Sequence, residues 1–325
     1  MRHMLLLAVS MVTFLILTVA PWPTFQQALT ALTTPVPLTT TCAALPPNPN
    51  YYKSGGETAA IAAMNHARAR EGLPALALPD NYWQLSAPEQ QFILVNLERS
   101  SRGLAPLRWD DTLAQIATAY SRQMVQLQFF AHTSPISGSF QARLNANPSI
   151  ANHYQSIGEN IAGNWAPAAG AAYEYLYNDA NEHCAHRQNI LNPQFNFIGI
   201  GTAPGGPWKV MSAQELLASN PDNPYRGAPR DDSPPTVTLG SAVNPAATRL
   251  SVNATVSDNQ GVARVIWYLD TLSAAGQAGT HWTLDASRLT YGEHRLTVYV
   301  VDESQNYTTA TLSFTVSAQS ITLQK

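Results

Sequence analysis

The sequence predicts two folded modules in series, an α/β sandwich followed by an all-β sandwich. Three observations lead to this prediction. Helical periodicity dominates the chain as far as residue 129, whereas strand-like runs first appear near residue 195. A proline-rich break over residues 219–235 then interrupts all regular structure. After the break, β-branched residues alternate with polar ones between turn residues, which is the pattern of a protein built of sheets.

Composition narrows the class of protein. A chain of 325 residues is long enough for two domains, each with a core of its own. Charged residues make up 12 % of the chain, about half the usual fraction, and the net charge is −3 with a pI near 6.2. No run of Lys or Arg gives the chain a basic surface, so no nucleic acid is expected as a partner.

The N-terminal residues have the pattern of a targeting segment. Arg2 precedes an apolar stretch over residues 4–20, which is interrupted only by one Ser and two Thr residues. The stretch is long for a signal peptide and short for a spanning helix, so residues 1–20 are interpreted as a signal peptide or an N-terminal anchor. Residues 21–56 are rich in Pro and Thr and are expected to form a spacer. We therefore expect a secreted or cell-surface protein.

The chain has two cysteines, Cys42 and Cys184. In an exported protein the default expectation is a disulfide, which here would tie the N-terminal segment to the first module. Two unpaired thiols are the alternative, because a sequence does not show whether two residues are close in space.

The first module is predicted over residues 57–218 and opens with a helical extension. A first helix is predicted over residues 57–71, because Gly72 is suited to end it. A second helix should begin after Ser86, whose side chain can form a capping box with Glu89.

The third predicted helix, over residues 112–129, has the clearest periodicity. Asp110 and Asp111 lie at its N-terminal end, where the helix dipole favours negative charge. Strands are predicted over residues 195–202 and 208–212. The apolar stripe of the helix consists of Leu113, Ile116, Ala117, Tyr120, Met124 and Leu127.

The second module is predicted over residues 236–317, after the linker at 219–235. It contains no cysteine, so no disulfide joins its sheets. About 80 residues of alternating strands and turns are typical of an immunoglobulin-like sandwich. Its predicted strands cover residues 236–239, 249–256, 263–269, 294–301 and 308–316.

Three side chains in the first module are candidates for chemistry. His132 lies in Phe-Ala-His-Thr, Glu159 in Gly-Glu-Asn-Ile and His186 in His-Arg-Gln-Asn-Ile-Leu. Two neutral imidazoles and a carboxylate suit Zn²⁺ and would leave an open fourth position. Alternatively, a His–Glu pair could act as a general base, or His132 and Glu159 could form a hydrogen bond that is purely structural.

These motifs, together with several others in the same order, resemble the bacterial branch of the CAP superfamily (cysteine-rich secretory, antigen 5 and pathogenesis-related proteins). The resemblance covers residues 92–217. The second module resembles the Ig-like modules that are appended to many bacterial surface proteins. The further motifs of the first module are Asn96-Leu97-Glu98-Arg99, Trp109-Asp110, Arg143 and Ile198-Gly199-Ile200-Gly201.

The resemblance implies a three-layer α-β-α sandwich with a central cleft where two histidines and usually two acids converge. It makes His132 and His186, the expected metal ligands, the cleft histidines, and Glu159 the first acid. Tyr175 takes the place of a Trp that normally precedes the second acid by three residues, which puts Asn178 where that acid is expected. The neighbouring acid, Asp179, is expected to point about 100° away on a helix.

Other polar residues near these motifs are expected to have lesser roles. His183 could meet His186 on one helical face, or it could be a surface residue beside Cys184. Asn160, Arg187 and Asn189 are expected to brace loops. His153, in a loop rich in Asn and Ser, is expected to be solvated.

The sequence leaves three functions open. The first is a non-enzymatic secreted protein whose cleft binds a divalent metal or a small apolar ligand, with the second module attaching it to a surface. The second is a metal-assisted hydrolase or peptidase with Glu159 as candidate base, although no motif marks a nucleophile. The third is an adhesive structural protein with a vestigial cleft. Zn²⁺ is the expected cofactor if there is one, and a lipid or an envelope polysaccharide is the expected kind of partner.

Overall fold

The fold is described from a computed structural model, which covers residues 55–206, 208–227, 231–244, 249–272, 276–317 and 320–324. The predicted export segment, almost all of the spacer and Cys42 lie outside these residues. The Cys42–Cys184 disulfide therefore stays a prediction. Within the described residues no helix is both long enough and apolar enough to cross a membrane.

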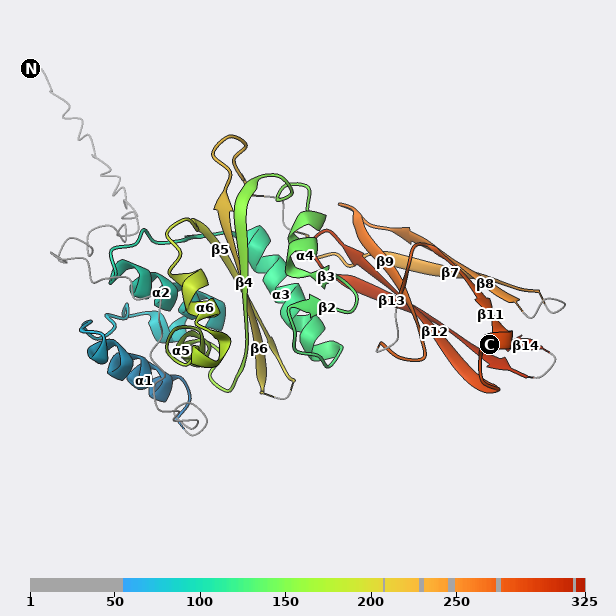
Figure 1. Cartoon of the computed structure of the whole chain (residues 1–325), viewed down its shortest axis with the longest axis horizontal. Helices are drawn as coiled ribbons and strands as arrows, with labels where there is room; N and C mark the ends of the chain where they lie inside the picture. Colours follow the sequence, from blue (N-terminus) through green and yellow to red (C-terminus); the bar gives the residue numbers. More distant parts are fainter. Residues whose placement is uncertain are drawn as a thin grey trace, which may run out of the picture. The chain divides into compact units, whose positions relative to one another are not determined.

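The first module is built around a four-stranded sheet (Figure 1). Its strand order is β1-β5-β6-β4, in which β1 runs parallel to β5 and the other neighbours are antiparallel. Strand β4 is an edge strand. The strands are β1 (Arg108–Trp109), β4 (Tyr154–Asn164), β5 (Phe197–Pro204) and β6 (Val210–Ser219).

Helices cover both faces of this sheet and complete three layers. On one face, α3 packs on the sheet through a core that includes Leu113, Phe197 and Leu217. On the other face, α1, α2, α5 and α6 enclose a larger core that includes Ile198 and Leu216. The predicted α-β-α sandwich is confirmed. The helices are α1 (Gly56–Arg70), α2 (Ala87–Ser100), α3 (Asp111–Gln126), α4 (Phe140–Ala146), α5 (Ala169–Tyr177) and α6 (Ala185–Ile190).

The helix starts follow from local hydrogen bonding. The capping box of α2 is present, because Glu89 accepts a hydrogen bond from the backbone N–H of Ser86 at 2.8 Å. At the start of α3, the Asp110 carboxylate accepts a hydrogen bond from the backbone N–H of Leu113 at 2.9 Å. Asp110, one of the two acidic residues near the start of this helix, thus also fixes where the helix begins.

Two glycines of β5 let α3 lie directly on the sheet. A Cβ added at Gly199 would lie 2.0 Å from the backbone nitrogen of Ala114, and one added at Gly201 would lie 2.0 Å from that of Thr118. Both contacts are with helix backbone, which cannot move aside as a side chain could. The Ile-Gly-Ile-Gly motif therefore sets the spacing between the sheet and α3.

The second module is a β-rich domain of antiparallel sheets, as predicted (Figure 1). One sheet has the order β10-β9-β12-β13-β14 and the other has the order β11-β8-β7. Trp267 is completely buried between them and its indole N–H donates to the Gly279 carbonyl at 2.6 Å. The strands are β7 (Thr236–Asn244), β8 (Arg249–Ser257), β9 (Val262–Leu269), β10 (Gln277–Ala278), β11 (His281–Asp285), β12 (Gly292–Asp302), β13 (Tyr307–Val316) and β14 (Ile321–Leu323).

The two modules share a small core. Ile136, which lies between the short strands β2 (Thr133–Ser134) and β3 (Gly138–Ser139), packs with buried side chains of the second module that include Tyr268. The Gln123 side chain of α3 also donates to the Gln305 carbonyl at 3.0 Å.

Candidate functional site

Glu159 lies at the centre of a buried polar cluster on β4. Its Oε1 is 2.7 Å from Nδ1 of His132, and its Oε2 accepts a hydrogen bond from the guanidinium of Arg143. The Glu159 side chain is completely buried, whereas that of His132 is 49 % exposed. The imidazole is thus held by a buried carboxylate through Nδ1, which leaves Nε2 as the nitrogen that can meet a ligand.

Arg143 neutralises this cluster from α4. Its side chain is completely buried, and its guanidinium carbon lies 3.4 Å from the centre of the Tyr120 ring. It also donates to the carbonyl oxygens of His132 and Gly138, at 3.1 and 2.8 Å. A buried cation is stable only when it is paired and hydrogen-bonded, and Arg143 meets both conditions.

Glu215 completes the cluster and was not named among the predicted site residues. It lies opposite Glu159 in the β4–β6 pairing, is completely buried, and has an oxygen 4.0 Å from the Arg143 guanidinium. Burial first, and then the charge of Glu159, raises the pKa of Glu215 well above its usual value. Burial therefore favours the neutral form of the Glu215 carboxyl group over its charged form.

His186 has a carboxylate partner as well, and it is Asp179. His186 Nδ1 lies 2.6 Å from Asp179 Oδ1, and the backbone N–H of Arg187 donates to Asp179 Oδ2 at 2.9 Å. The prediction that Asp179 points away assumed a continuous helix. That assumption is wrong, because α5 ends at Tyr177 and the chain turns at Asn178 (φ −118°, ψ 38°), so helical spacing does not govern the next residue.

The structure also places two other histidines. His183 lies in a left-handed turn (φ 54°) before α6 begins, so it shares no helical face with His186 and is an exposed surface residue, which was the other alternative. His153 is half-buried rather than solvated, and its Nδ1 is shielded from solvent without a hydrogen-bond partner.

The three residues expected to brace loops lie in β4 and α6 and connect regular elements instead. Asn189 Nδ2 donates to Asn160 Oδ1 at 2.8 Å and to the Glu159 carbonyl at 3.3 Å, which ties α6 to β4. Arg187 donates to the Leu176 carbonyl at 2.7 Å and so ties α6 to α5.

A cavity of about 360 Å³ lies beside these elements. Phe130, Trp165 and Trp208 contribute aromatic rings to its lining, while Glu174 and Asn178 contribute polar groups. Asn178 donates to Glu174 at 2.7 Å, which fixes the amide within the lining. The remaining lining residues are Ile161, Ala162, Gly163, Tyr175, Asp179, Asn181, Glu182 and His186.

The aromatic residues of this cavity are unusually exposed. Five large hydrophobic side chains are exposed among the described residues, and three of them, Phe130, Trp165 and Trp208, line this cavity with 42, 42 and 38 % exposure. The Phe130 and Trp208 ring centres are 5.0 Å apart. Gly163 makes room for the indole, because a Cβ at that position would lie 2.4 Å from a Trp208 ring carbon.

The structure separates the predicted site residues into two groups. Asn178 and His186 line the cavity, whereas His132 and Glu159 are not among its lining residues and form the buried cluster. Among the described residues, the ligand atoms of His132, Glu159 and His186 do not form a group within 4.8 Å of one another. The three-ligand Zn²⁺ site therefore does not fit the arrangement as it stands.

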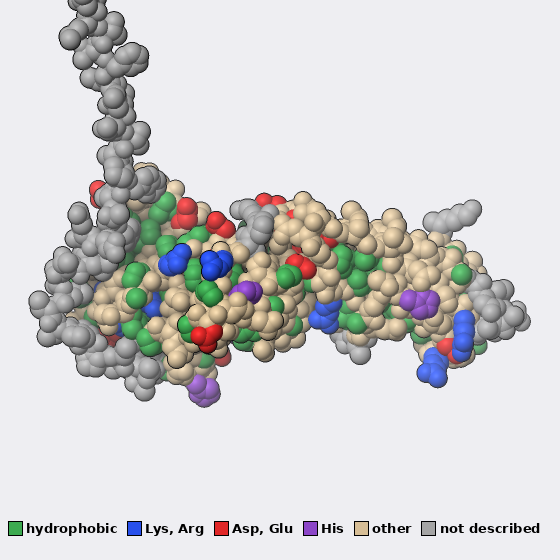
Figure 2. Space-filling view, turned by 90° about the horizontal axis from the view of Figure 1, so that it is seen from above, with side chains coloured by type: hydrophobic (Ala, Val, Ile, Leu, Met, Phe, Trp, Pro, Cys, Tyr) green, Lys and Arg blue, Asp and Glu red, His purple; other side chains and the backbone are tan. Residues whose placement is uncertain are grey.

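The face of the molecule in Figure 2 has few charged side chains. Basic and acidic side chains form small groups there, among hydrophobic side chains and atoms of other kinds. A larger cavity, of about 550 Å³, is lined by residues such as Phe92, Trp109 and Arg122 and contains none of the predicted site residues.

Comparison with known proteins agrees with this architecture. Residues 92–215 match the model of the cysteine-rich secretory protein family, known as CAP, and residues 235–298 match the bacterial Ig domain. The uncharacterized protein YkwD of Bacillus subtilis is 35 % identical over 123 residues, which are 38 % of this chain and 45 % of that protein. The uncharacterized membrane protein YlbC of the same organism is 31 % identical over 128 residues, which are 38 % of this chain and 35 % of that protein. The match thus spans less than half the length of either relative.

Solved structures are similar to parts of this chain. An extracellular protein from Bacillus anthracis that contains an SCP domain is 29 % identical, with a TM-score of 0.35, over 44 % of this chain and 45 % of that one. The PKD1 domain of the Vibrio cholerae metalloprotease PrtV is 16 % identical, with a TM-score of 0.23, over 26 % of this chain and all of that one.

Proposed function

The chain carries a CAP domain at residues 92–215 followed by a bacterial Ig domain, and from this premise we propose that it is an extracellular binding protein. The ligand is a small molecule with an apolar surface, held in the cavity that Phe130, Trp165 and Trp208 line. Export is supported by the apolar stretch over residues 4–20. The matched family is described as one of secretory proteins, which also supports export.

One observation carries the proposal: three of the five exposed large hydrophobic side chains line a single cavity. Clustered aromatic rings in contact with water are costly, and such patches commonly mark places where a ligand or partner binds. A volume of about 360 Å³ also falls within the range of small-molecule sites. Glu174, Asn178 and His186 would orient a polar group of the ligand.

The arrangement favours binding over hydrolysis. The candidate base Glu159 is completely buried and in contact with His132 and Arg143, so a substrate cannot reach it directly. The sequence also offers no motif for a nucleophile.

The proposal is tested by what the protein carries when it is purified. We expect mass spectrometry of organic extracts to detect an apolar compound with the wild-type chain and to detect much less with the Trp165→Ala/Trp208→Ala variant. Trp83→Ala is the matched control, because Trp83 is 52 % exposed but lies outside the cavity. Equal recovery from all three proteins would refute the proposal.

Binding of a divalent metal through His132 and His186 is a second candidate. It is favoured by one observation, that each Nδ1 contacts a carboxylate, Glu159 or Asp179. Metal-binding histidines commonly have such a partner, which leaves Nε2 for the metal. Water would supply the remaining ligands.

Calorimetric titration with Zn²⁺ tests this candidate. Saturable binding that disappears in His132→Ala/His186→Ala and persists in His66→Ala, where the exposed His66 of α1 is replaced, would support it. Absence of heat with the folded wild-type chain would eliminate it.

The Ig-like module is proposed to attach the protein to a surface such as an envelope polysaccharide. Its own hydrophobic core supports its production as a separate domain. If that domain sediments with cell walls and the chain without residues 236–325 does not, attachment is its role. If the separate domain stays in solution and the chain without residues 236–325 sediments, attachment belongs to the CAP domain.

A further inference from the structure

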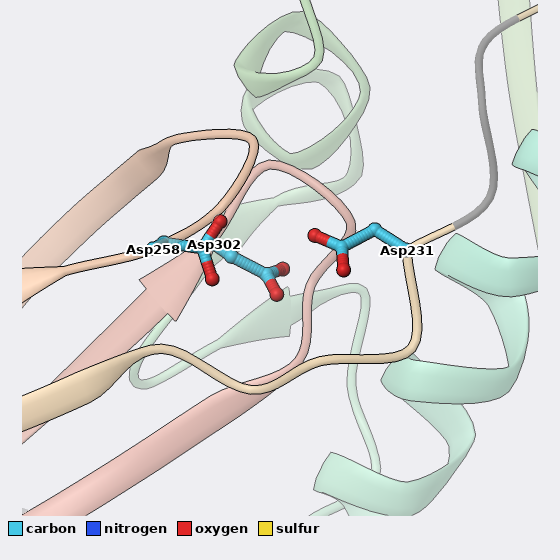
Figure 3. Close-up of side chains that lie close together, drawn as sticks. All are labelled: Asp231, Asp258 and Asp302. Atoms are coloured by element: carbon cyan, nitrogen blue, oxygen red, sulfur yellow. The ribbon is translucent and has the colours of Figure 1, made fainter.

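Three aspartates from separate segments meet at one end of the Ig-like module (Figure 3). Asp231 lies in the linker before β7, Asp258 directly follows β8, and Asp302 is the last residue of β12. Each offers one carboxylate oxygen, and these three oxygens lie within 4.8 Å of one another. Figure 3 shows the carboxylates of Asp231 and Asp302 facing each other, with Asp258 beside Asp302.

Local hydrogen bonds fix the three carboxylates. Asp231 Oδ1 accepts from the backbone N–H of Ser233 at 3.0 Å and from the Asn259 side chain at 3.1 Å. Asp258 Oδ1 accepts from two backbone N–H groups in the turn that follows it, both at 2.9 Å. Asp302 receives two hydrogen bonds from Asn306, one from its backbone and one from its side chain, both at 2.9 Å. The carboxylates are thus oriented before any ligand arrives.

Within the described part of the chain, the second oxygen of two of these carboxylates has no hydrogen-bond partner. Asp231 is only 2 % exposed, and its Oδ2 atom is buried and accepts no hydrogen bond. The Oδ2 atom of Asp258 is also buried and accepts no hydrogen bond. A buried charged oxygen without a partner is expensive, so native proteins rarely leave one unpaired. Both orphaned oxygens belong to the same cluster, which indicates that something binds there.

No basic group compensates this charge within the described residues. None of the Lys or Arg side chains that the structure describes forms an ion pair with any of the three aspartates. The cluster has an excess of negative charge that a cation would balance.

We propose that Asp231, Asp258 and Asp302 form a Ca²⁺ site. The ligands are all oxygens, which suits a hard cation rather than Zn²⁺. Ca²⁺ accepts carboxylates in irregular, flexible arrangements, whereas Mg²⁺ requires near-ideal octahedral geometry and keeps much of its water. Three carboxylates from three separate segments match the first pattern.

The ion would fix the linker to the module that follows it. Asp231 comes from the linker, and its backbone N–H also donates to the Gln115 side chain of α3 at 3.0 Å. Its carbonyl accepts a hydrogen bond from the Asn306 side chain at 2.9 Å. Binding at Asp231 would therefore hold the point where the chain passes from the first module to the second.

Calorimetric titration of the metal-free full chain with CaCl₂ tests the site. A dissociation constant in the range of about 10⁻⁴ to 10⁻³ M is expected, as in other extracellular modules. Asp302→Asn and Asp258→Asn each keep the shape of the side chain and remove one charge. We expect either to weaken binding by about tenfold or more, since affinity follows the charge of the ligands. Asp222→Asn is the matched control, because Asp222 is an exposed linker residue outside the cluster.

A second measurement guards against variants that fail to fold. Circular dichroism must show native sheet content for each variant, and thermal unfolding of the wild type should shift upward with Ca²⁺ while that of Asp258→Asn does not. Binding that survives in both cluster variants would overturn the proposal. So would a wild-type chain that shows no heat and no thermal shift with Ca²⁺.

Discussion

At the scale of single residues, the most unusual feature is the cluster of buried ionisable side chains next to His132. Glu159 and Glu215 face each other across two strands, and Arg143 lies between them and the Tyr120 ring. A cluster of this kind is stable only when its net charge is balanced, because each unpaired charge in a buried site costs several kcal/mol. The raised pKa of Glu215 makes its neutral form easier to keep than that of an ordinary carboxyl group, which lowers this cost.

The stability of the protein should depend on pH through Glu215. Its carboxyl has a raised pKa in the folded state and an ordinary one, near 4.5, in the unfolded state. As the pH rises above that ordinary value, the folded state retains a proton that the unfolded state releases, so the free energy of unfolding falls until the raised folded pKa is passed. Glu215→Gln cannot titrate and escapes this loss.

We therefore expect Glu215→Gln to gain stability relative to the wild type as the pH rises from about 4 to about 8. Denaturant midpoints of both proteins across this range provide the measurement. A difference between the midpoints that does not change with pH would show that Glu215 titrates normally.

The sequence identified most of these residues but not their partners. His132, Glu159 and His186 were found because they lie in recognisable motifs, and Arg143 accompanied them. Glu215 was missed because its partner lies across a sheet, 56 positions away in the chain, although a single acid within the apolar run of β6 was a usable signal. Asp179 was misplaced because the end of α5 depends on tertiary packing rather than on a local stop residue.

At the scale of elements, the close contact between α3 and β5 determines how the layers fit. The helix itself was predictable, since its apolar stripe has the helical period and Asp110 caps it. Strand β4 was not predicted, because Glu159 and Asn160 are polar yet buried and so hide the alternation of an ordinary strand. Strand β6 was predicted to end at residue 212 and in fact extends to Ser219.

Gly199→Ala tests the contact between these layers. The added methyl would lie 2.0 Å from a backbone nitrogen of α3, so the helix must shift off the sheet. We expect a loss of about 3 kcal/mol or more in the free energy of unfolding, at the upper end for overpacked sites. Gly240→Ala, also in a strand but with nothing within 4 Å, should be close to neutral. Equal denaturant midpoints for both variants would contradict the account of this interface.

At the scale of the whole molecule, the division into two modules was predictable and their contact was not. The linker at residues 219–235 is visible from its prolines, and the alternating strands after it gave the all-β class. The shared core depends on Ile136 meeting Tyr268, and nothing in the local pattern of either segment indicates such a partner. The aspartate cluster was missed for the same reason, since its members come from three separate segments.

The central claim is that the aromatic-lined cavity binds an apolar ligand, and a fluorescence titration tests it most directly. Anilinonaphthalene sulfonate is added to extracted wild-type protein, to Trp165→Ala/Trp208→Ala and to Trp83→Ala. We predict saturable binding to the wild type and to Trp83→Ala, and at least about tenfold weaker binding to the double variant, because two of its aromatic contacts are lost. Equal affinity in all three proteins would place the binding elsewhere and contradict the account.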